Sequence, residues 1–420
     1  MLLEQQSTEE LQTKLKDENM HVVFTVSLQS VVALAKHYGI DPEKVRARRN
    51  ERHGPCNFDV RSMERRTDEV PKLCETKQTF RRIAGVLKTM GAKEVYDTCF
   101  GKDLSLIEIA DEFVTRYKER GCMPMLASAC PGWICYAEKT LGNFALPYIS
   151  TTKSPQQIAG TVVKNFICNK KSLDPRKVYH CTIMPCYDKK LESSREDFVT
   201  GEAEHSYCEV DCVITTGELA ELFETRGISI ADSAEGMVDD MTGLDQEERG
   251  AFFSTPGGSG GFVEHVFREA ALSLFGEKVD GPLQMRILRN QDFREVTLEV
   301  NGEKVLNFAT VYGFRNIQNL VRKLKMGKSP YHFVEIMACP GGCVNGGGQL
   351  PPKEGQSSKE LIAELETMYN ASIQYRHPRE NKKVERLYAE WLTSPHQRQR
   401  MLHTGYHARE NTIGIQVNNW

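Results

Sequence analysis

Four cysteines in three separated segments give the chain its most visible chemistry. Cys130 lies in Ser-Ala-Cys-Pro-Gly-Trp, Cys186 in Met-Pro-Cys-Tyr-Asp-Lys-Lys, and Cys339 and Cys343 in Ala-Cys-Pro-Gly-Gly-Cys. Thiolates are soft ligands that suit zinc or iron-sulfur clusters. Zinc sites more often use two close Cys-x-x-Cys pairs. Here one Cys-x-x-x-Cys pair is combined with two remote single cysteines, which favours a cluster held between two lobes.

Each cysteine segment follows a short apolar run of the kind that forms buried strands. Such runs cover residues 21–27, 94–98, 123–128, 180–184, 212–216 and 331–337. Helical patterns alternate with them, as at residues 104–120 and 154–169, and this alternation indicates parallel sheets. Ligands of parallel sheets collect beyond the carboxyl ends of the strands. The sequence therefore predicts an α/β fold with mostly parallel sheets flanked by helices and a metal site at strand ends.

The same pattern suggests a division of the chain. Near Asn301 and Gly302, two β-rich runs meet at a tight turn, which predicts a hairpin. A Pro-rich stretch after Gln349 predicts a linker into a mostly helical tail. We expect an N-terminal remnant (1–20), a first α/β lobe (21–178) with an inserted loop (46–77), a second lobe (179–350) with a hairpin (296–312), and a helical C-terminal extension and tail (351–420).

Composition narrows the class of protein. The 420 residues are 40% hydrophobic, and 54 Lys and Arg against 57 Asp and Glu leave a net charge of −3. No basic excess is available to gather nucleic acid or an anionic membrane, so we expect a protein partner. The 13 cysteines are scattered and odd in number, which favours a reducing compartment. With no signal peptide and no long apolar run, we expect the cytoplasm, with the nucleus as an alternative.

The segment 46–77 differs from the rest because it is rich in arginine and poor in apolar residues. A solvated loop of mixed charge is the favoured interpretation, and a nucleic-acid or nuclear-targeting role is the alternative. Cys56 and Cys74 lie in this segment, but their spacing does not support a metal site.

The three cysteine motifs, in this order, resemble the signature loops of the iron-only hydrogenase superfamily. The resemblance extends through Tyr312-Gly-Phe-Arg-Asn-Ile-Gln and Leu402-His-Thr-Gly-Tyr-His. Within the superfamily, Trp133-Ile-Cys-Tyr-Ala-Glu-Lys and Cys186-Tyr-Asp-Lys-Lys-Leu-Glu are most similar to the eukaryotic cytosolic iron-sulfur assembly factors, also called nuclear prelamin A recognition factor-like proteins.

This resemblance implies a [4Fe-4S] cluster bound by Cys130, Cys186, Cys339 and Cys343. It also implies that the protein is an assembly or transfer factor rather than an enzyme, because Ala129 stands where hydrogenases carry a proton-relay cysteine and a methyl group cannot exchange a proton. A hydrogenase is the enzymatic alternative. It is kept open by three residues at positions that line the diiron pocket of hydrogenases: Lys189, Glu192 and Met337. For these residues the alternatives are a solvated helix cation for Lys189 and a core position for Met337.

The resemblance further implies the partners. Factors of this type carry an N-terminal cysteine set for a second cluster; this chain lacks that set, so one inner cluster is expected. Family tails that end in an aromatic residue resemble the signal read by the cytosolic iron-sulfur targeting complex, which makes Trp420 a partner-binding candidate. Asn419 replaces the usual acidic residue before it. The alternatives are a frayed end or a Trp packed on the core and, for the whole protein, a prelamin A tail-binding function in the nucleus.

Three weaker motifs have structural alternatives. Gly257-Gly-Ser-Gly-Gly fits the nucleophile-elbow pattern, but a flexible glycine turn is favoured. His403 and His407 have the spacing of a helical metal pair, although packing against the core is favoured. Cys208 and Cys212 share the spacing of the ligand pair without its glycines, so a buried strand at Cys212 is favoured over a second metal site.

Overall fold

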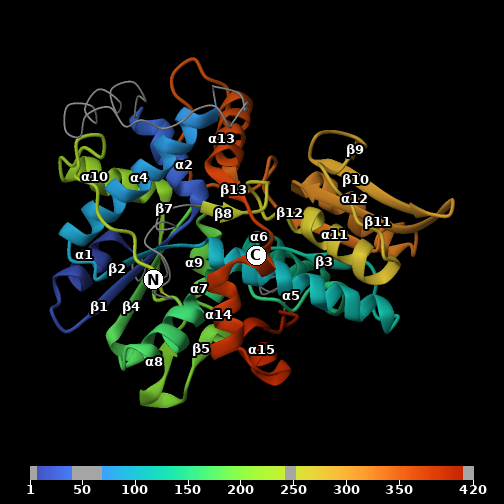
Figure 1. The fold of residues 1–420 in the computed structure, drawn as a ribbon, viewed down its shortest axis with the longest axis horizontal. Helices are drawn as coiled ribbons and strands as arrows, with labels where there is room; N and C mark the ends of the chain where they lie inside the picture. The colour runs from blue at the N-terminus through green and yellow to red at the C-terminus, as the bar shows by residue number, and fades with distance from the viewer. Residues whose placement is uncertain (1–6, 40–68, 242–251, 410–420) are drawn as a thin grey trace, which may run out of the picture.

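The computed structural model describes residues 7–39, 69–241 and 252–409, and it contains a four-stranded and a five-stranded sheet that lie side by side (Figure 1). Helices flank both sheets, as the sequence predicts. Trp420, Cys56 and residues 46–68 of the predicted loop lie outside the described residues, as does the side chain of Cys74.

The four-stranded sheet is entirely parallel. In spatial order its strands are β2 (Glu94–Asp97), β1 (His21–Val26), β4 (Val178–Met184) and β7 (Cys212–Thr215). Successive side chains of a strand point to opposite faces, so Phe24 and Val26 enter one apolar cluster and Val23 enters another. The first cluster is covered by α1 (Thr8–Lys16), α2 (Leu28–Tyr38), α4 (Glu69–Thr89) and α10 (Thr216–Thr225).

The opposite face of this sheet is covered by α5 (Cys99–Lys118) and by the helix that follows Ser154. The Ser154 side chain caps α7 (Pro155–Thr161), whose first residue is proline, a favoured residue at this position. The helix continues as a π-helical turn (Val162–Ile167) and ends in α8 (Cys168–Lys170). It corresponds to the helix predicted for residues 154–169.

The five-stranded sheet is mixed. Its order is β3 (Met125–Ala127), β12 (Phe333–Met337), β11 (Glu303–Tyr312), β10 (Phe293–Val300) and β9 (Arg286–Ile287), with β3, β12 and β11 parallel. The predicted hairpin is the antiparallel pair β10–β11, which turns at Asn301 and Gly302, both in the left-handed region. Its core includes Phe113, Phe308 and Phe333, whose rings make edge-to-face or tilted contacts. The flanking helices include α11 (Phe262–Phe275) and α12 (Phe314–Lys325).

Two expectations about the division of the chain are wrong. The sheets do not separate at residue 178, because β4 and β7, from the predicted second lobe, pair beside β1, and β3, from the predicted first lobe, pairs with β12. The physical reason is that parallel strands need long crossovers, which allow the chain to pass between sheets. The predicted loop 46–77 is also wrong for residues 69–77, which form the start of α4.

The C-terminal extension is mostly helical, as predicted. It contains α13 (Ser358–Ser372), α14 (Lys382–Glu390) and α15 (Pro395–Leu402). A capping box of Ser357 and Glu360 starts α13. A short strand, β13 (Ile373–Tyr375), pairs in parallel with β8 (Phe252–Ser254). Leu365 and Tyr369 of α13 are buried in the first apolar cluster, so the extension is part of the core.

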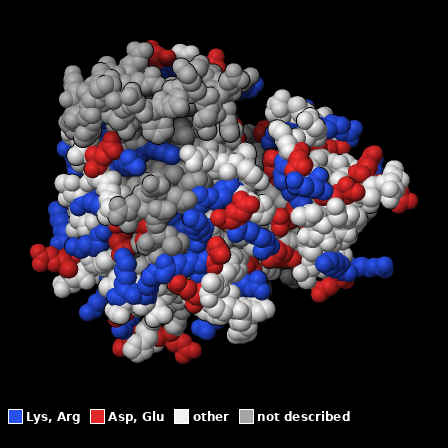
Figure 2. Space-filling model, in the orientation of Figure 1, with Lys and Arg blue, Asp and Glu red and all other residues white. Residues whose placement is uncertain are grey.

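Charged side chains of both signs are interspersed over the face shown in Figure 2. This agrees with the nearly balanced composition. Among the described helices, none combines the length and the apolar character needed to cross a membrane.

Candidate metal centre

The four predicted ligand cysteines follow the carboxyl ends of three strands. Cys130 comes shortly after β3, Cys186 after β4, and the Cys339–Cys343 turn after β12. A structured turn or helix follows each: α6 (Pro131–Tyr136), α9 (Asp188–Ser193) and the 3₁₀ turn Cys343–Asn345. The site therefore draws on both sheets, since β4 belongs to the four-stranded sheet and β3 and β12 to the five-stranded one.

The structure brings the four thiols together. Burial, then the charge of Asp188 and of the Cys130 and Cys339 thiolates, raises the pKa of Cys186 to about 12. Burial and the charge of Cys130 raise the pKa of Cys339 to about 11. For Cys343, burial together with the charges of the other three cysteines raises the pKa well above its usual value. Because such interactions weaken with distance, each of the six thiol pairs lies within electrostatic range.

Among the four cysteines, Cys130 is the one that is buried as a whole residue, and its thiol has its own hydrogen-bond donors. Cys130 is 8% exposed, and its Sγ accepts a hydrogen bond from the Ala338 amide at 3.4 Å. Burial raises the pKa of this thiol, while backbone donors at Ala338, Trp133 and Gly132 act in the opposite direction. Such donors stabilise a thiolate once a metal has displaced the proton.

The Gly346-Gly-Gly run after Cys343 lets the backbone approach the Cys186 segment. A Cβ on Gly346 would overlap the carbonyl oxygen of Pro185, and one on Gly348 would lie 2.7 Å from Thr215 Cβ. By contrast, a Cβ on Gly347 would approach nothing closer than a Tyr187 ring carbon at 4.0 Å. Two of these three glycines are therefore needed for packing of one ligand segment on another.

The predicted pocket residues Lys189, Glu192 and Met337 are all buried. Lys189 Nζ lies 2.6 Å from Glu192 Oε2 and donates to Ser154 Oγ at 3.1 Å. The alternative of a solvated helix cation is therefore wrong for Lys189. Met337 packs in the core of the five-stranded sheet, in agreement with its core alternative.

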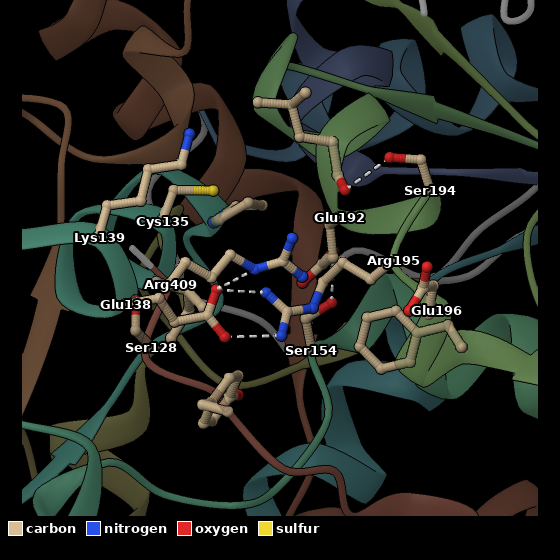
Figure 3. A pocket seen from close by; sticks show the side chains of 15 residues that line it. Ser128, Cys135, Glu138, Lys139, Ser154, Glu192, Ser194, Arg195, Glu196 and Arg409 are labelled. Atoms are coloured by element: carbon tan, nitrogen blue, oxygen red, sulfur yellow. Dashed lines mark hydrogen bonds and ion pairs between the residues drawn. The ribbon is translucent and has the colours of Figure 1, made fainter. Parts of the chain in front are cut away.

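A cavity of about 350 Å³ opens beside the Cys130 helix (Figure 3). Ser128 and Pro131 line it on either side of Cys130, and Cys135 and Glu192 also face it. Cys135 lies on α6, the helix that follows Cys130.

A buried ion pair on the cavity wall joins the segment after α6 to the segment after α9. Arg195 donates to both carboxylate oxygens of Glu138, at 2.8 and 2.9 Å. Burial alone would raise the pKa of Glu138, but the hydrogen bonds from Arg195 outweigh it and lower the pKa. Sequence reasoning missed this pair because its members are 57 positions apart and neither belongs to a recognisable motif.

In the described part of the chain, no group of three or more His, Cys, Asp or Glu side chains is arranged to hold a single metal ion. The sulfur ligands of one Zn²⁺ lie about 2.3 Å from the ion. A cubane carries its ligands on four separate iron atoms, so its thiolates stand further apart.

Residues 65–347, which include all four cysteines, match the family described as "Iron only hydrogenase large subunit, C-terminal domain". The chain belongs to the iron-only hydrogenase family. Residues 359–409 match a second family, "Iron hydrogenase small subunit". The resemblance inferred from the three motifs is thereby confirmed.

Curated relatives cover nearly the whole chain. It is 45% identical over 426 residues to "Cytosolic Fe-S cluster assembly factor narfl" of Danio rerio, covering 98% of this chain and 94% of the relative. It is 42% identical to "Protein NAR1" of Arabidopsis thaliana, with 100% and 85% covered. For "Cytosolic iron-sulfur assembly component 3" of Mus musculus the identity is 44%, with 98% and 80% covered.

Solved structures agree with the family assignment. A variant of the apo [FeFe]-hydrogenase HydA1 from Chlamydomonas reinhardtii superposes with a TM-score of 0.76 at 28% identity, covering 96% of this chain and 98% of the hydrogenase. The described fold is thus that of an iron-only hydrogenase.

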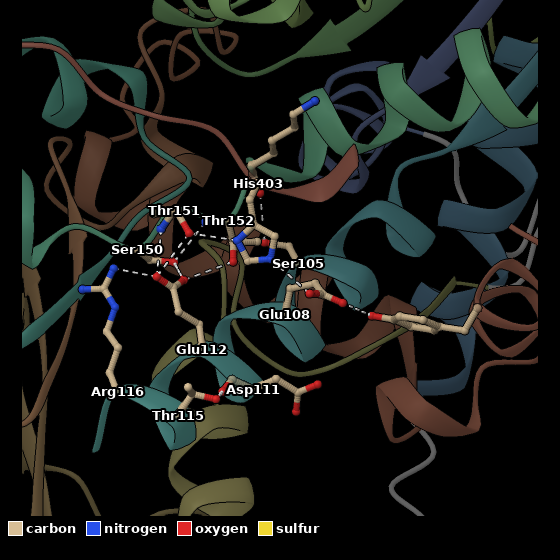
Figure 4. A network of polar contacts seen from close by, with 12 residues as sticks. Ser105, Glu108, Asp111, Glu112, Thr115, Arg116, Ser150, Thr151, Thr152 and His403 are labelled. Atoms are coloured by element: carbon tan, nitrogen blue, oxygen red, sulfur yellow. Dashed lines mark hydrogen bonds and ion pairs between the residues drawn. The ribbon is translucent and has the colours of Figure 1, made fainter. Parts of the chain in front are cut away.

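The small-subunit region of this hydrogenase-like chain is tied to α5 by a polar network (Figure 4). The His403 ring nitrogens contact Thr151 Oγ1 at 2.9 Å and Glu108 Oε2 at 3.1 Å. His407 contacts Asp197 Oδ1 at 3.1 Å instead. The two histidines have separate partners and lie beyond the end of α15, so the metal-pair alternative is wrong and packing against the core is confirmed for His403.

Proposed function

We propose that this chain is an iron-sulfur protein of the cytosolic iron-sulfur assembly machinery and takes part in cluster delivery to target apoproteins. Its cofactor is one [4Fe-4S] cluster with Cys130, Cys186, Cys339 and Cys343 as ligands. The convergence of these four thiols is the observation that carries the proposal. The names of the relatives, which are cytosolic assembly factors, support the cellular role.

The donor set fits such a cluster. All four donors are thiols, backbone N–H groups point at Cys130, and glycines allow the main chain close to the ligands. The bound cluster would supply one-electron redox chemistry or sulfide-bridged iron for transfer. The chain itself excludes water around Cys130 and holds the free thiols protonated at neutral pH, because burial and mutual repulsion raise their pKa values.

We propose that hydrogen turnover is not the function, although the relatives of known structure are hydrogenases. Ala129, directly before Cys130, offers no exchangeable proton. The Lys189 ammonium in the adjacent pocket is neutralised by Glu192. Hydrogen evolution with a strong reductant after anaerobic reconstitution tests the alternative, and a rate above that of the Cys339→Ala variant would favour it.

The partners are, in this proposal, protein subunits of the cytosolic iron-sulfur targeting complex. The cytosol as location is supported by the names of the relatives, and mixed surface charge is compatible with a protein partner. Trp420 is the candidate contact. Removal of Trp420 is expected to abolish capture by targeting-complex subunits while leaving bound iron unchanged. Equal capture would exclude this role, and selective capture of a prelamin A tail would favour the nuclear alternative.

Iron and sulfide analysis of anaerobically purified protein tests the cofactor directly. We expect about four irons and four sulfides per chain. About eight irons would require a second cluster. A preparation that contains only zinc would overturn the cluster assignment.

A further inference from the structure

The segment of residues 257–261, Gly-Gly-Ser-Gly-Gly, follows β8 and lies against the ligand turn. It is not a flexible loop, since its central Ser259 is only 5% exposed. Gly257, Gly260 and Gly261 adopt left-handed backbone angles, which glycine permits at little cost. Neither a nucleophile elbow nor a solvent turn accounts for a buried serine at this place.

Ser259 contacts the turn that carries Cys343. Its Oγ accepts a hydrogen bond from the Cys343 backbone amide at 2.7 Å. The fit is close, because a Cβ on the neighbouring Gly342 would overlap the Ser259 side chain. The Ser259 hydroxyl therefore fixes the position of the Cys343 backbone nitrogen.

Three side chains form hydrogen bonds with the backbone of this segment. Gly258 donates its amide to Glu366 Oε1 at 3.0 Å and accepts from Gln29 Nε2 at 2.7 Å. The amide of Gly257 donates to Asn370 Oδ1 at 3.1 Å. Glu366 and Asn370 lie on α13 and Gln29 on α2. Two helices outside the ligand segments thus set the position of Ser259.

We propose that Ser259 is a positioning residue for the iron-sulfur cluster: it holds the Cys343 turn, and its hydroxyl would donate a hydrogen bond to a sulfur of the bound cluster. A serine hydroxyl can donate one hydrogen bond while it accepts others. Accepting the Cys343 amide leaves the hydroxyl proton available for a further acceptor. Since hydrogen bonds to sulfur stabilise the more negative, reduced cluster, such a donor would raise the midpoint potential of a bound cluster. The inference rests on the proposed cluster.

Two substitutions at Ser259 distinguish the effect of the hydroxyl group from the effect of side-chain size. Ser259→Ala removes the hydrogen bond from the Cys343 amide together with the proposed one to sulfur, and leaves a smaller side chain. Ser259→Thr retains the hydroxyl. Ser372→Ala is the matched control, because it also removes a buried hydroxyl, one that lies 2.6 Å from Thr76 Oγ1 rather than beside a ligand.

The experiment uses the full chain, reconstituted anaerobically with iron and sulfide. Midpoint potential is measured by redox titration followed by electron paramagnetic resonance of the reduced cluster, and iron loss to a chelator is timed. Ser259→Ala should lower the potential and release iron about tenfold faster than wild type. Ser259→Thr should restore both values toward wild type, and Ser372→Ala should change only the melting temperature.

The outcomes distinguish this inference from the proposed function. Wild-type potential and wild-type iron release in Ser259→Ala, with a full cluster present, would overturn the role of Ser259 and leave the cluster assignment intact. Failure of wild type itself to bind a cluster would overturn the proposed function. If Ser259→Ala and Ser372→Ala shifted potential and iron release equally, the effect would be general destabilisation and the inference would be wrong.

Discussion

The two ends of the candidate metal centre are supported in different ways. Cys130 is enclosed by the core of the five-stranded sheet, and its sulfur is contacted by the backbone of the neighbouring strand end through Ala338. The Cys339–Cys343 turn is partly exposed and depends on Ser259 and on glycines that fit against other segments. Cys130 is thus held by the core of the five-stranded sheet. The Cys339–Cys343 turn is held by contacts from residues outside that sheet.

The largest expected effect is the loss of a ligand. Cys339→Ala and Cys130→Ala should each lose nearly all bound iron, because three thiolates cannot complete the site. The metal-free variants should differ: Cys130→Ala loses about 1–2 kcal/mol of unfolding free energy from the core, and Cys339→Ala remains close to wild type. Iron assays and denaturant unfolding check this. Cys122→Ala, at an exposed position, is the control, and full iron in either ligand variant would refute the ligand set.

The Glu138–Arg195 pair tests the support on the Cys130 side. Glu138 is 2% and Arg195 9% exposed as side chains. Arg195→Met should therefore cost about 3 kcal/mol of unfolding free energy, since it leaves a buried carboxylate without its main partner. Calorimetry measures the loss. Arg176→Met, which removes an exposed ion pair with Asp174, should leave melting unchanged. Equal melting of the two variants would show that the buried pair does not support this region.

The Gly346–Gly348 run tests the support on the side of the Cys339–Cys343 turn. Gly346→Ala should cost about 2 kcal/mol of unfolding free energy and reduce iron retention, because its Cβ meets the fixed Pro185 backbone. Gly347→Ala, one position along, should change the free energy of unfolding by no more than about 0.5 kcal/mol. Denaturant unfolding and iron content are the measurements. Comparable losses in both variants would contradict the close approach.

The smallest effect concerns the contact between the extension and α11. A hydrogen bond from His377 lowers the pKa of Glu269 to about 2, and this contact raises the pKa of His377. The Glu269 contribution is present above its usual pKa of 4.5 and is lost as pH falls toward 2. The His377 contribution is present below its usual pKa of 6.5 and is lost as pH rises through the raised value.

The pair should therefore stabilise the fold most between pH 4.5 and 6.5. Its partial exposure limits the gain to less than about 1 kcal/mol. Melting curves of wild type and His377→Gln across this pH range should differ most inside that window. Parallel curves at every pH would rule out the linkage.

Sequence reasoning was successful where the chemistry is local. The strands before Cys130, Cys186 and Cys339 were predicted because a buried parallel strand is a continuous apolar run. The role of these cysteines as ligands stays a prediction. The interleaving of the sheets was not predicted, since no local pattern states which strands pair. The same limit explains the missed ion pair of Glu138 and the contact of Ser259 with Cys343, which join residues far apart in sequence.

The interleaving of the two sheets has a consequence for biosynthesis. The four-stranded sheet is incomplete until β7 has left the ribosome, and the five-stranded sheet until β12 has. Cys343, the last of the four cysteines, emerges only after about four fifths of the 420 residues. Domains fold as units during translation. A nascent chain that has not yet been extended to Cys343 does not carry the complete set of four thiols. For the proposed cluster, metallation would therefore follow the synthesis of all four ligand segments.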